Sequence, residues 1–142
     1  EQVVSPHKAA QLKAAPEGLD TLLETTWSWL QGADEAGRRR VVTLGDPAYP
    51  PSLLATEDPP LLLYMMGQEL TPDALGHCVA VVGSRNPTPQ GEANAQQFAK
   101  ALAGAGLTVV SGMALGVDGA AHRGALEGAA PGQLATIAVR GA

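Results

Sequence analysis

The chain has 142 residues, enough for one ordinary domain with a small appendage, and 45% of them are hydrophobic while 16% are charged. This balance is typical of a globular protein and excludes a disordered tail or a nucleic-acid-binding arm built mainly from charge. The net charge of −5 argues against general affinity for nucleic acid, but the acidity lies at the front, and residues 79–142 carry four basic and three acidic side chains.

The front of the chain is predicted to form a small helical segment over residues 1–37. A short helix is expected over residues 5–15, with Ser5 as N-cap. A second helix is expected to have Asp20 as its N-cap and to stop at Gly32. Apolar side chains recur at helical spacing in this second helix: Leu19, Leu22, Leu23, Thr26, Trp27 and Leu30. Residues 33–37 are taken as a linker to a second domain at 38–142.

Two short strands are predicted next, over residues 40–44 and 61–66. Clusters of Pro, Gly and Asp separate them and indicate turns. A brief helical turn is expected around residues 71–73.

The last third has the clearest pattern. Short apolar strands are predicted at 79–82, 107–110 and 136–139, and helices at 92–105 and 118–127, the second capped by Asp118. In the first of these helices, one face is expected to be buried: Ala95, Phe98, Ala99, Leu102 and Ala103. The order predicts an α/β fold, a Rossmann-like parallel sheet with a partial βαβαβ core.

Two glycine-containing loops follow the first two of these strands. Ligands of open parallel sheets lie beyond the carboxyl ends of the strands, and a helix N-terminus offers N–H donors to an anion. We therefore expect a phosphate-binding site without a bound cofactor, catalytic group or metal. Its residues are Gly83, Ser84 and Arg85 from one loop and Ser111, Gly112, Met113, Ala114, Leu115 and Gly116 from the other. A pair of tight turns without a ligand remains the alternative.

The dinucleotide fingerprint G-x-G-x-x-G and the Walker pattern are both absent, which disfavours a dinucleotide or ATP. Asp118 and His122 share one helix face. They are either an acid/base pair or part of a metal site, or else a cap and a packed histidine, and the last alternative is favoured. The basic run 38–40 either follows a nucleic-acid backbone or is a solvated loop that feeds a strand, again with the second favoured.

Three further side chains have simple interpretations. Trp27 lies on the apolar stripe and is expected in the core, whereas the place of Trp29 stays open. Cys78 is the single cysteine, which excludes an internal disulfide, and it is expected to be a small packed side chain. No signal peptide or membrane span is visible, so a cytoplasmic protein without membrane contact is expected.

Several ordered motifs resemble the DNA-processing protein family DprA, also called Smf. They cover roughly residues 40–142 and include Tyr49-Pro50-Pro51-Ser52-Leu53-Leu54, Val79-Ala80-Val81-Val82-Gly83-Ser84-Arg85, Val110-Ser111-Gly112-Met113-Ala114-Leu115-Gly116-Val117-Asp118 and Ala121-His122-Arg123-Gly124-Ala125-Leu126. The resemblance implies a Rossmann-like core after a small helical domain. It also implies single-stranded DNA binding without catalysis, protection of incoming DNA in natural transformation (competence), and help in loading RecA during DNA recombination.

The same resemblance places the DNA pocket on the nine loop residues given above. Some family members carry a basic residue where this chain has Leu115, so one phosphate contact is expected to be missing. Relatives continue beyond the position of Ala142 with surfaces implied in dimerisation and RecA contact, so we expect a piece of a longer protein and a possible homodimer.

Two other readings stay open. One is an enzyme of the related lysine-decarboxylase-like superfamily that cleaves a nucleoside monophosphate, although its Pro-Gly-Gly-x-Gly-Thr motif does not occur in this sequence. The other is a fragment that folds and binds nothing.

Overall fold

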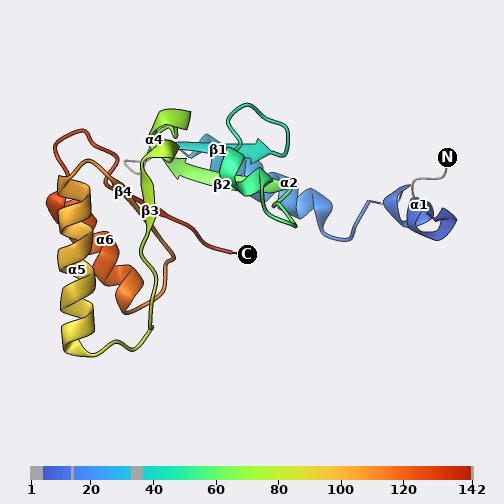
Figure 1. Ribbon diagram of the computed structural model, residues 1–142. Coiled ribbons are helices and arrows are strands. Elements are labelled where there is room, and N and C mark those ends of the chain that lie inside the picture. Colours follow the sequence, from blue (N-terminus) through green and yellow to red (C-terminus); the bar gives the residue numbers. More distant parts are fainter. Residues whose placement is uncertain (1–4, 14, 33–36, 142) are drawn as a thin grey trace. The chain divides into compact units, whose positions relative to one another are not determined.

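A computed structural model describes residues 5–13, 15–32 and 37–141 (Figure 1). The helices are α1 (Pro6–Lys13), α2 (Leu19–Gln31), α3 (Pro51–Leu54), α4 (Pro72–Gly76), α5 (Pro89–Gly104) and α6 (Val117–Gly128). The strands are β1 (Arg38–Thr43), β2 (Leu62–Gly67), β3 (Cys78–Ala80), β4 (Thr108–Ser111) and β5 (Thr136–Ala138). The predicted α/β class and the βαβαβ order of the last third are confirmed, whereas the short helix α3 was not predicted.

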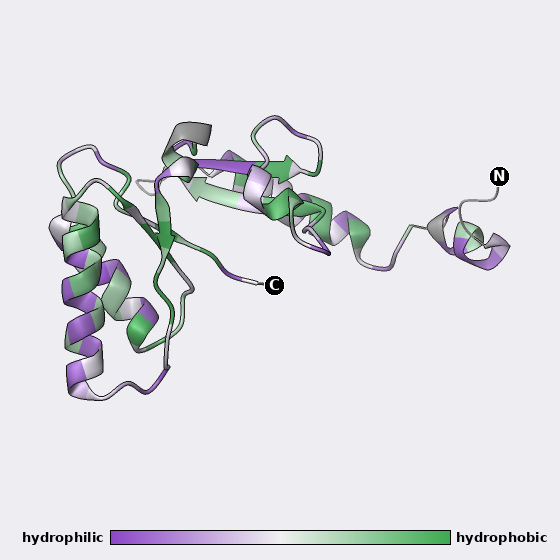
Figure 2. Cartoon of the chain, in the orientation of Figure 1, coloured by the Kyte–Doolittle hydropathy of each residue, from purple (hydrophilic) through white to green (hydrophobic). Residues whose placement is uncertain are grey.

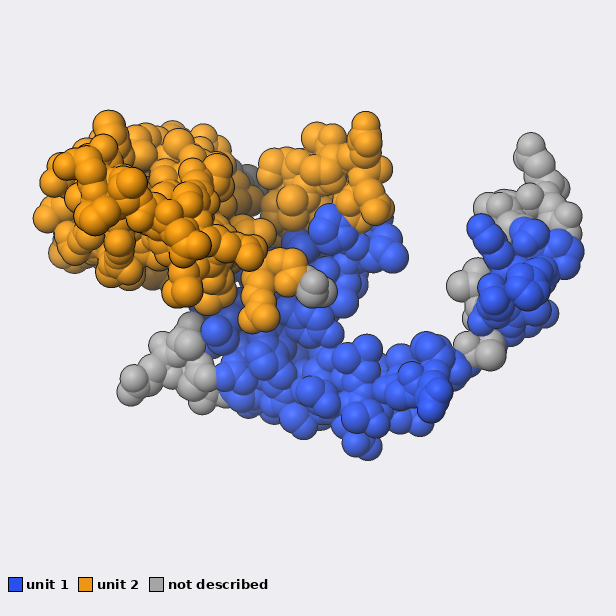
Figure 3. All heavy atoms as spheres, turned by 90° about the horizontal axis from the view of Figure 1, so that it is seen from below, with its two compact units in different colours: residues 1–46, 60–67 blue, residues 47–59, 68–142 orange. Residues whose placement is uncertain are grey.

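The chain divides into two compact units, which Figure 3 colours separately. Unit 1 contains α1, α2, β1 and β2, and unit 2 contains α3, α4, the three remaining strands, α5 and α6. The predicted domain boundary between residues 37 and 38 stays a prediction. Four residues of the predicted linker, 33–36, lie outside the described residues.

In unit 1, α2 packs on an antiparallel ribbon formed by β1 and β2. The Trp29 ring meets the Tyr64 ring edge-on at 5.5 Å, and Arg39 lies over the Trp29 ring at 5.7 Å. Arg39 also donates to the Trp29 carbonyl oxygen at 3.0 Å. The indole and guanidinium therefore hold the helix on the ribbon through aromatic and cation–π contacts.

Two expectations for α2 were wrong. Trp27, expected in the core, is 65% exposed, because the face that meets the ribbon carries Trp29 instead. Asp20 is not the N-cap, since the Gly18 carbonyl already accepts from Leu22 and the helix begins at Leu19.

Unit 2 is built on a parallel sheet in the order β3-β4-β5. Parallel neighbours need crossover connections, and α5 and α6 provide them. Because such crossovers are right-handed, both helices lie on the same face of the sheet, as Figure 1 shows. The carboxyl ends of all three strands consequently meet at one edge.

The core between sheet and helices consists of small side chains. Val109 of β4 is fully buried against alanines of both helices: Ala99, Ala103, Ala121 and Ala125. Figure 2 shows hydrophobic colouring on β3 and alternating hydrophobic and hydrophilic residues along α5. Phe98, predicted on the buried face of α5, is 69% exposed, because the small side chains of Ala99 and Ala103 fill the buried face of this helix.

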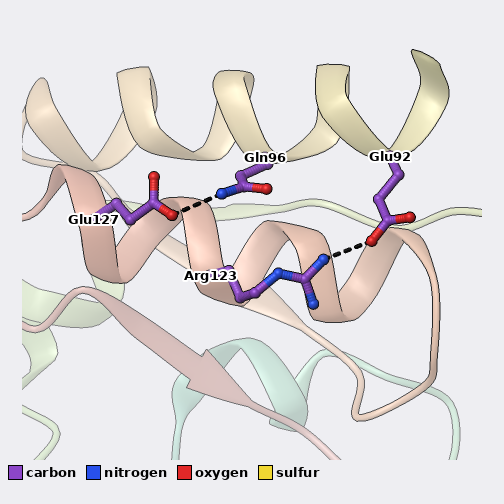
Figure 4. Close-up of polar contacts among 4 residues, drawn as sticks. All are labelled: Glu92, Gln96, Arg123 and Glu127. Atoms are coloured by element: carbon purple, nitrogen blue, oxygen red, sulfur yellow. Dashed lines mark hydrogen bonds and ion pairs between the residues drawn. The ribbon is translucent and has the colours of Figure 1, made fainter. Parts of the chain in front are cut away.

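Polar side chains join α5 to α6 along their exposed margin (Figure 4). Arg123 donates to Glu92 at 2.6 Å, and the Gln96 amide donates to Glu127 at 2.7 Å. Lys100 lies 3.5 Å from Glu127. Lys100 and Arg123 therefore both have carboxylate partners between these two helices.

The beginnings of α5 and α6 differ from the predicted ones. α5 begins at Pro89 rather than residue 92, because the Thr88 hydroxyl accepts from Gly91 N–H and Pro89 suits the first helical position. In α6 the Gly116 carbonyl accepts from Ala120, so Asp118 is inside the first turn and is not the cap.

Candidate nucleic-acid interface

An open pocket of about 820 Å³ lies at the carboxyl edge of the parallel sheet in unit 2. Each strand contributes to it through the segment that follows. The lining residues are Arg85 and Asn86 after β3, Gly112, Met113, Ala114, Leu115 and Asp118 after β4, and Val139, Arg140 and Gly141 after β5. The pocket therefore forms where open parallel sheets bind ligands.

The first loop leaves β3 in a turn stabilised by Ser84. The Ser84 hydroxyl accepts from the Asn86 backbone N–H at 3.0 Å, a local bond typical of serine in turns. This turn presents the exposed side chain of Arg85 at the pocket. Ser84 therefore shapes the loop, and Arg85 is its charged lining residue.

Two side chains of α6 form hydrogen bonds with the backbone of the second loop, residues 111–116. Asp118 is 9% exposed, and its Oδ2 accepts from the Ala114 N–H at 3.3 Å. His122 donates from Nε2 to the Gly112 carbonyl oxygen at 2.7 Å, and its Nδ1 lies 2.7 Å from the Thr136 hydroxyl. Both His122 nitrogens thus have structural partners, which supports the packed-histidine alternative over an acid/base pair.

Gly116 brings the two loops together. Its φ of 82° and ψ of −126° suit glycine, and a Cβ there would lie 2.5 Å from the Ser84 oxygen and 2.7 Å from the Arg85 oxygen. The adjacent Val117 N–H donates to the Ser84 carbonyl at 3.1 Å. A side chain at residue 116 would force the loops apart.

Of the nine predicted site residues, five line the pocket: Arg85, Gly112, Met113, Ala114 and Leu115. The other four build its frame. Gly83 gives Val117 room, Ser84 forms the turn, and Gly116 permits the approach of the loops. Ser111 is buried and donates to the Val81 carbonyl at 2.7 Å, so its hydroxyl joins two strands.

The prediction missed the lining residues Asn86, Val139, Arg140 and Gly141, and it gave Asp118 no place in the site. The signal for Arg140 was present, because this residue directly follows the predicted strand 136–139. The rule that ligands lie beyond strand ends applies to the third strand as it does to the first two.

The cations of unit 2 fall into two groups. Lys100 and Arg123 form ion pairs between α5 and α6, whereas Arg85 and Arg140 line the pocket and have no ion pair within the described part of the chain. The pocket carboxylate, Asp118, is turned toward the second loop, where a Cβ on Gly112 would lie 2.6 Å from its Oδ2. The open side of the pocket is therefore predominantly cationic.

Two large apolar side chains stand beside these arginines. Met113 is 69% exposed and Leu115 is 83% exposed, although both belong to a loop with a supported backbone. Exposed apolar side chains next to cations suit a ligand with both anionic and apolar parts.

The remaining candidates have local roles. Cys78 donates from its thiol to the Ala74 carbonyl oxygen at 3.3 Å, and burial raises the pKa of this thiol. The basic run is not a loop, because residues 38–40 begin β1 and pair with residues 65–67 of β2, and Arg39 contacts Trp29. Across the residues that the structure describes, no cluster of three or more His, Cys, Asp or Glu side chains is placed to hold a metal ion.

No helix in the described ranges is long and apolar enough to cross a membrane.

Comparisons with known proteins match most of the chain. The family model described as DNA recombination-mediator protein A matches residues 40–142. The Protein Smf of Escherichia coli is 36% identical over 105 residues, which are 74% of this chain and 26% of that protein. The DNA processing protein DprA of Bacillus subtilis is 31% identical over 86 residues, which are 61% of this chain and 29% of that protein.

A second Protein Smf, from Synechocystis, is 37% identical over 87 residues, which are 60% of this chain and 22% of that protein. The chain spans less than a third of the length of these relatives.

Proposed function

Because the chain belongs to the DNA recombination-mediator protein A family, we propose that it binds single-stranded DNA in the pocket at the carboxyl edge of its parallel sheet. The observation that carries the proposal is the meeting of Arg85 with the second glycine loop, residues 111–116, in one open pocket. A phosphodiester chain offers the anionic oxygens that a guanidinium binds most strongly.

The composition of the pocket favours a single strand over a duplex. Met113 and Leu115 expose apolar surface beside the arginines, and unstacked bases can cover such surface. In a duplex the base faces are stacked and unavailable to these side chains. We expect the lining residues to contact no more than a few phosphates. Contacts with phosphate carry no sequence information, so binding should depend little on sequence.

We also propose that this binding serves the DNA-processing role named for its relatives, by protecting incoming strands in natural transformation and assisting RecA loading. A cytoplasmic location fits this role and fits the single thiol of Cys78. We assign no catalysis to the pocket, and release of free base from a nucleoside monophosphate would contradict that assignment.

A homodimer is part of the same proposal. Within the described residues, β3 pairs with β4 along one edge only, and its other edge has no strand partner. An apolar strand with an open edge tends to recruit another strand. Light scattering over a concentration series is expected to show self-association, and a strictly monomeric chain would contradict it.

The DNA-binding proposal is tested by fluorescence anisotropy with labelled oligonucleotides. We expect the 142-residue chain to bind single strands of different sequence with similar affinity and to bind duplex of the same length more weakly. The slope of log affinity against log salt should be shallow, on the order of −1 to −3, because few phosphates are contacted. Equal or tighter binding of duplex would reject the proposal.

A further inference from the structure

We propose that Arg140, which follows β5, is a second phosphate-binding residue of the pocket, so that the DNA backbone is held from two strand ends and not from Arg85 alone. This inference rests on the proposed function, which it deepens by assigning a DNA contact to a residue outside the two glycine loops.

The sheet topology places Arg140 at the pocket. β5 is parallel to β4 and pairs with it through Val109 and Thr136, so both strands end at the same edge. The ladder extends one residue further, because the Val139 N–H donates to the Ser111 carbonyl at 2.9 Å. The backbone is therefore fixed up to the residue before Arg140, and the side chain projects from a supported position.

The second step concerns charge. Arg140 is exposed, lines the pocket with Arg85, and has no ion pair within the described residues. In contrast, Lys100 and Arg123 have carboxylate partners in the helix layer. An arginine without a carboxylate partner keeps its full donor set for a bidentate contact with phosphate.

The pocket also contains a carboxylate, which would oppose a phosphate if it faced the ligand. Asp118 is nearly buried, and its Oδ2 accepts from the Ala114 N–H beneath the loop. One arginine would just balance this charge, whereas two arginines leave the pocket with a net positive charge. Arg140 thus supplies the net positive charge that the pocket needs to bind an anionic ligand.

The test compares the single-strand affinity of the 142-residue chain with that of Arg140→Ala, Arg140→Lys and Arg123→Ala. Arg123→Ala is the matched control, because it removes the same charge from an exposed site that is outside the pocket. We expect Arg140→Ala to bind about tenfold more weakly and to lower the magnitude of the salt slope by about 0.7, the value for one phosphate on a single strand. Arg140→Lys should keep the salt slope and lose part of the affinity.

The outcomes separate this inference from the proposed function. If the unaltered chain binds single strands and Arg140→Ala behaves like Arg123→Ala in affinity and salt slope, the role of Arg140 is rejected and the DNA-binding function stands. If the unaltered chain does not bind single strands, both are rejected. Thermal unfolding of each variant shows whether the fold is retained, and Arg140→Lys preserves the charge if Arg140→Ala does not fold.

Discussion

Gly124 of α6 lies against the backbone carbonyl of Gln96 of α5, with no space between them for a Cβ atom. One turn further along α6, Gly128 lies in the same way against the Lys100 carbonyl. This close approach allows the polar bridges from Glu92 to Arg123 and from Gln96 to Glu127 to form across the helices (Figure 4). It also fixes α6, whose first turn supports the second loop of the pocket.

The first prediction concerns this contact. Gly124→Ala should lower the free energy of unfolding by about 1–3 kcal/mol, because the new methyl group meets rigid backbone and overpacks the interface. Gly104→Ala in α5 is the control, since its Cβ would make an ordinary 3.5 Å contact with the Gly128 oxygen. Urea unfolding measures both, and a Gly124→Ala protein as stable as the unaltered chain would show that the helices are further apart.

The second prediction concerns Arg85. Arg85→Ala should weaken single-strand binding by about 1.5–3 kcal/mol, because a charge-assisted contact with phosphate is lost. The melting temperature should not change, since the side chain is exposed. Anisotropy titrations check this, with Arg123→Ala as the control. If both substitutions weaken binding equally and leave the melting temperature unchanged, the DNA does not bind at this pocket.

The third prediction separates the frame of the site from its contacts. Gly116→Ala should weaken DNA binding although residue 116 lacks a side chain and is not in the pocket lining. A Cβ at φ 82° is strained and overlaps the Ser84 and Arg85 carbonyls, so the two loops must separate. Hydrogen exchange should accelerate at the Val117 amide, which donates to Ser84. Unchanged exchange and affinity would argue against loop coupling.

The fourth prediction concerns pH. Burial raises the pKa of the Cys78 thiol, so the folded chain keeps the neutral thiol to higher pH than the unfolded chain does. Because the thiolate is the reactive form, alkylation by iodoacetamide between about pH 7 and 10 should rise at higher pH in the native protein than in urea. Coincident profiles in the two states would show that the thiol is effectively solvated.

Local sequence determined the three strands and the two long helices of unit 2 and the main loops of its site. Apolar strands, amphipathic helices and the glycines between them are short-range signals, and the parallel order then follows from the crossover helices. Five of the nine predicted residues line the pocket for this reason. The helix start at Pro89 was also readable from Thr88, because a cap and a proline act within one turn.

Only the tertiary structure decided which side chains of these segments line the pocket and which face the core. Periodicity placed Phe98 and Trp27 on buried faces, but both side chains are exposed. Alanines fill the buried face of α5, and Trp29 rather than Trp27 contacts the ribbon in unit 1. Arg140 joins Arg85 because β5 lies beside β4, a pairing of residues far apart in the chain. Burial and proximity depend on how elements pack, and this packing is set by contacts that no short stretch of sequence contains.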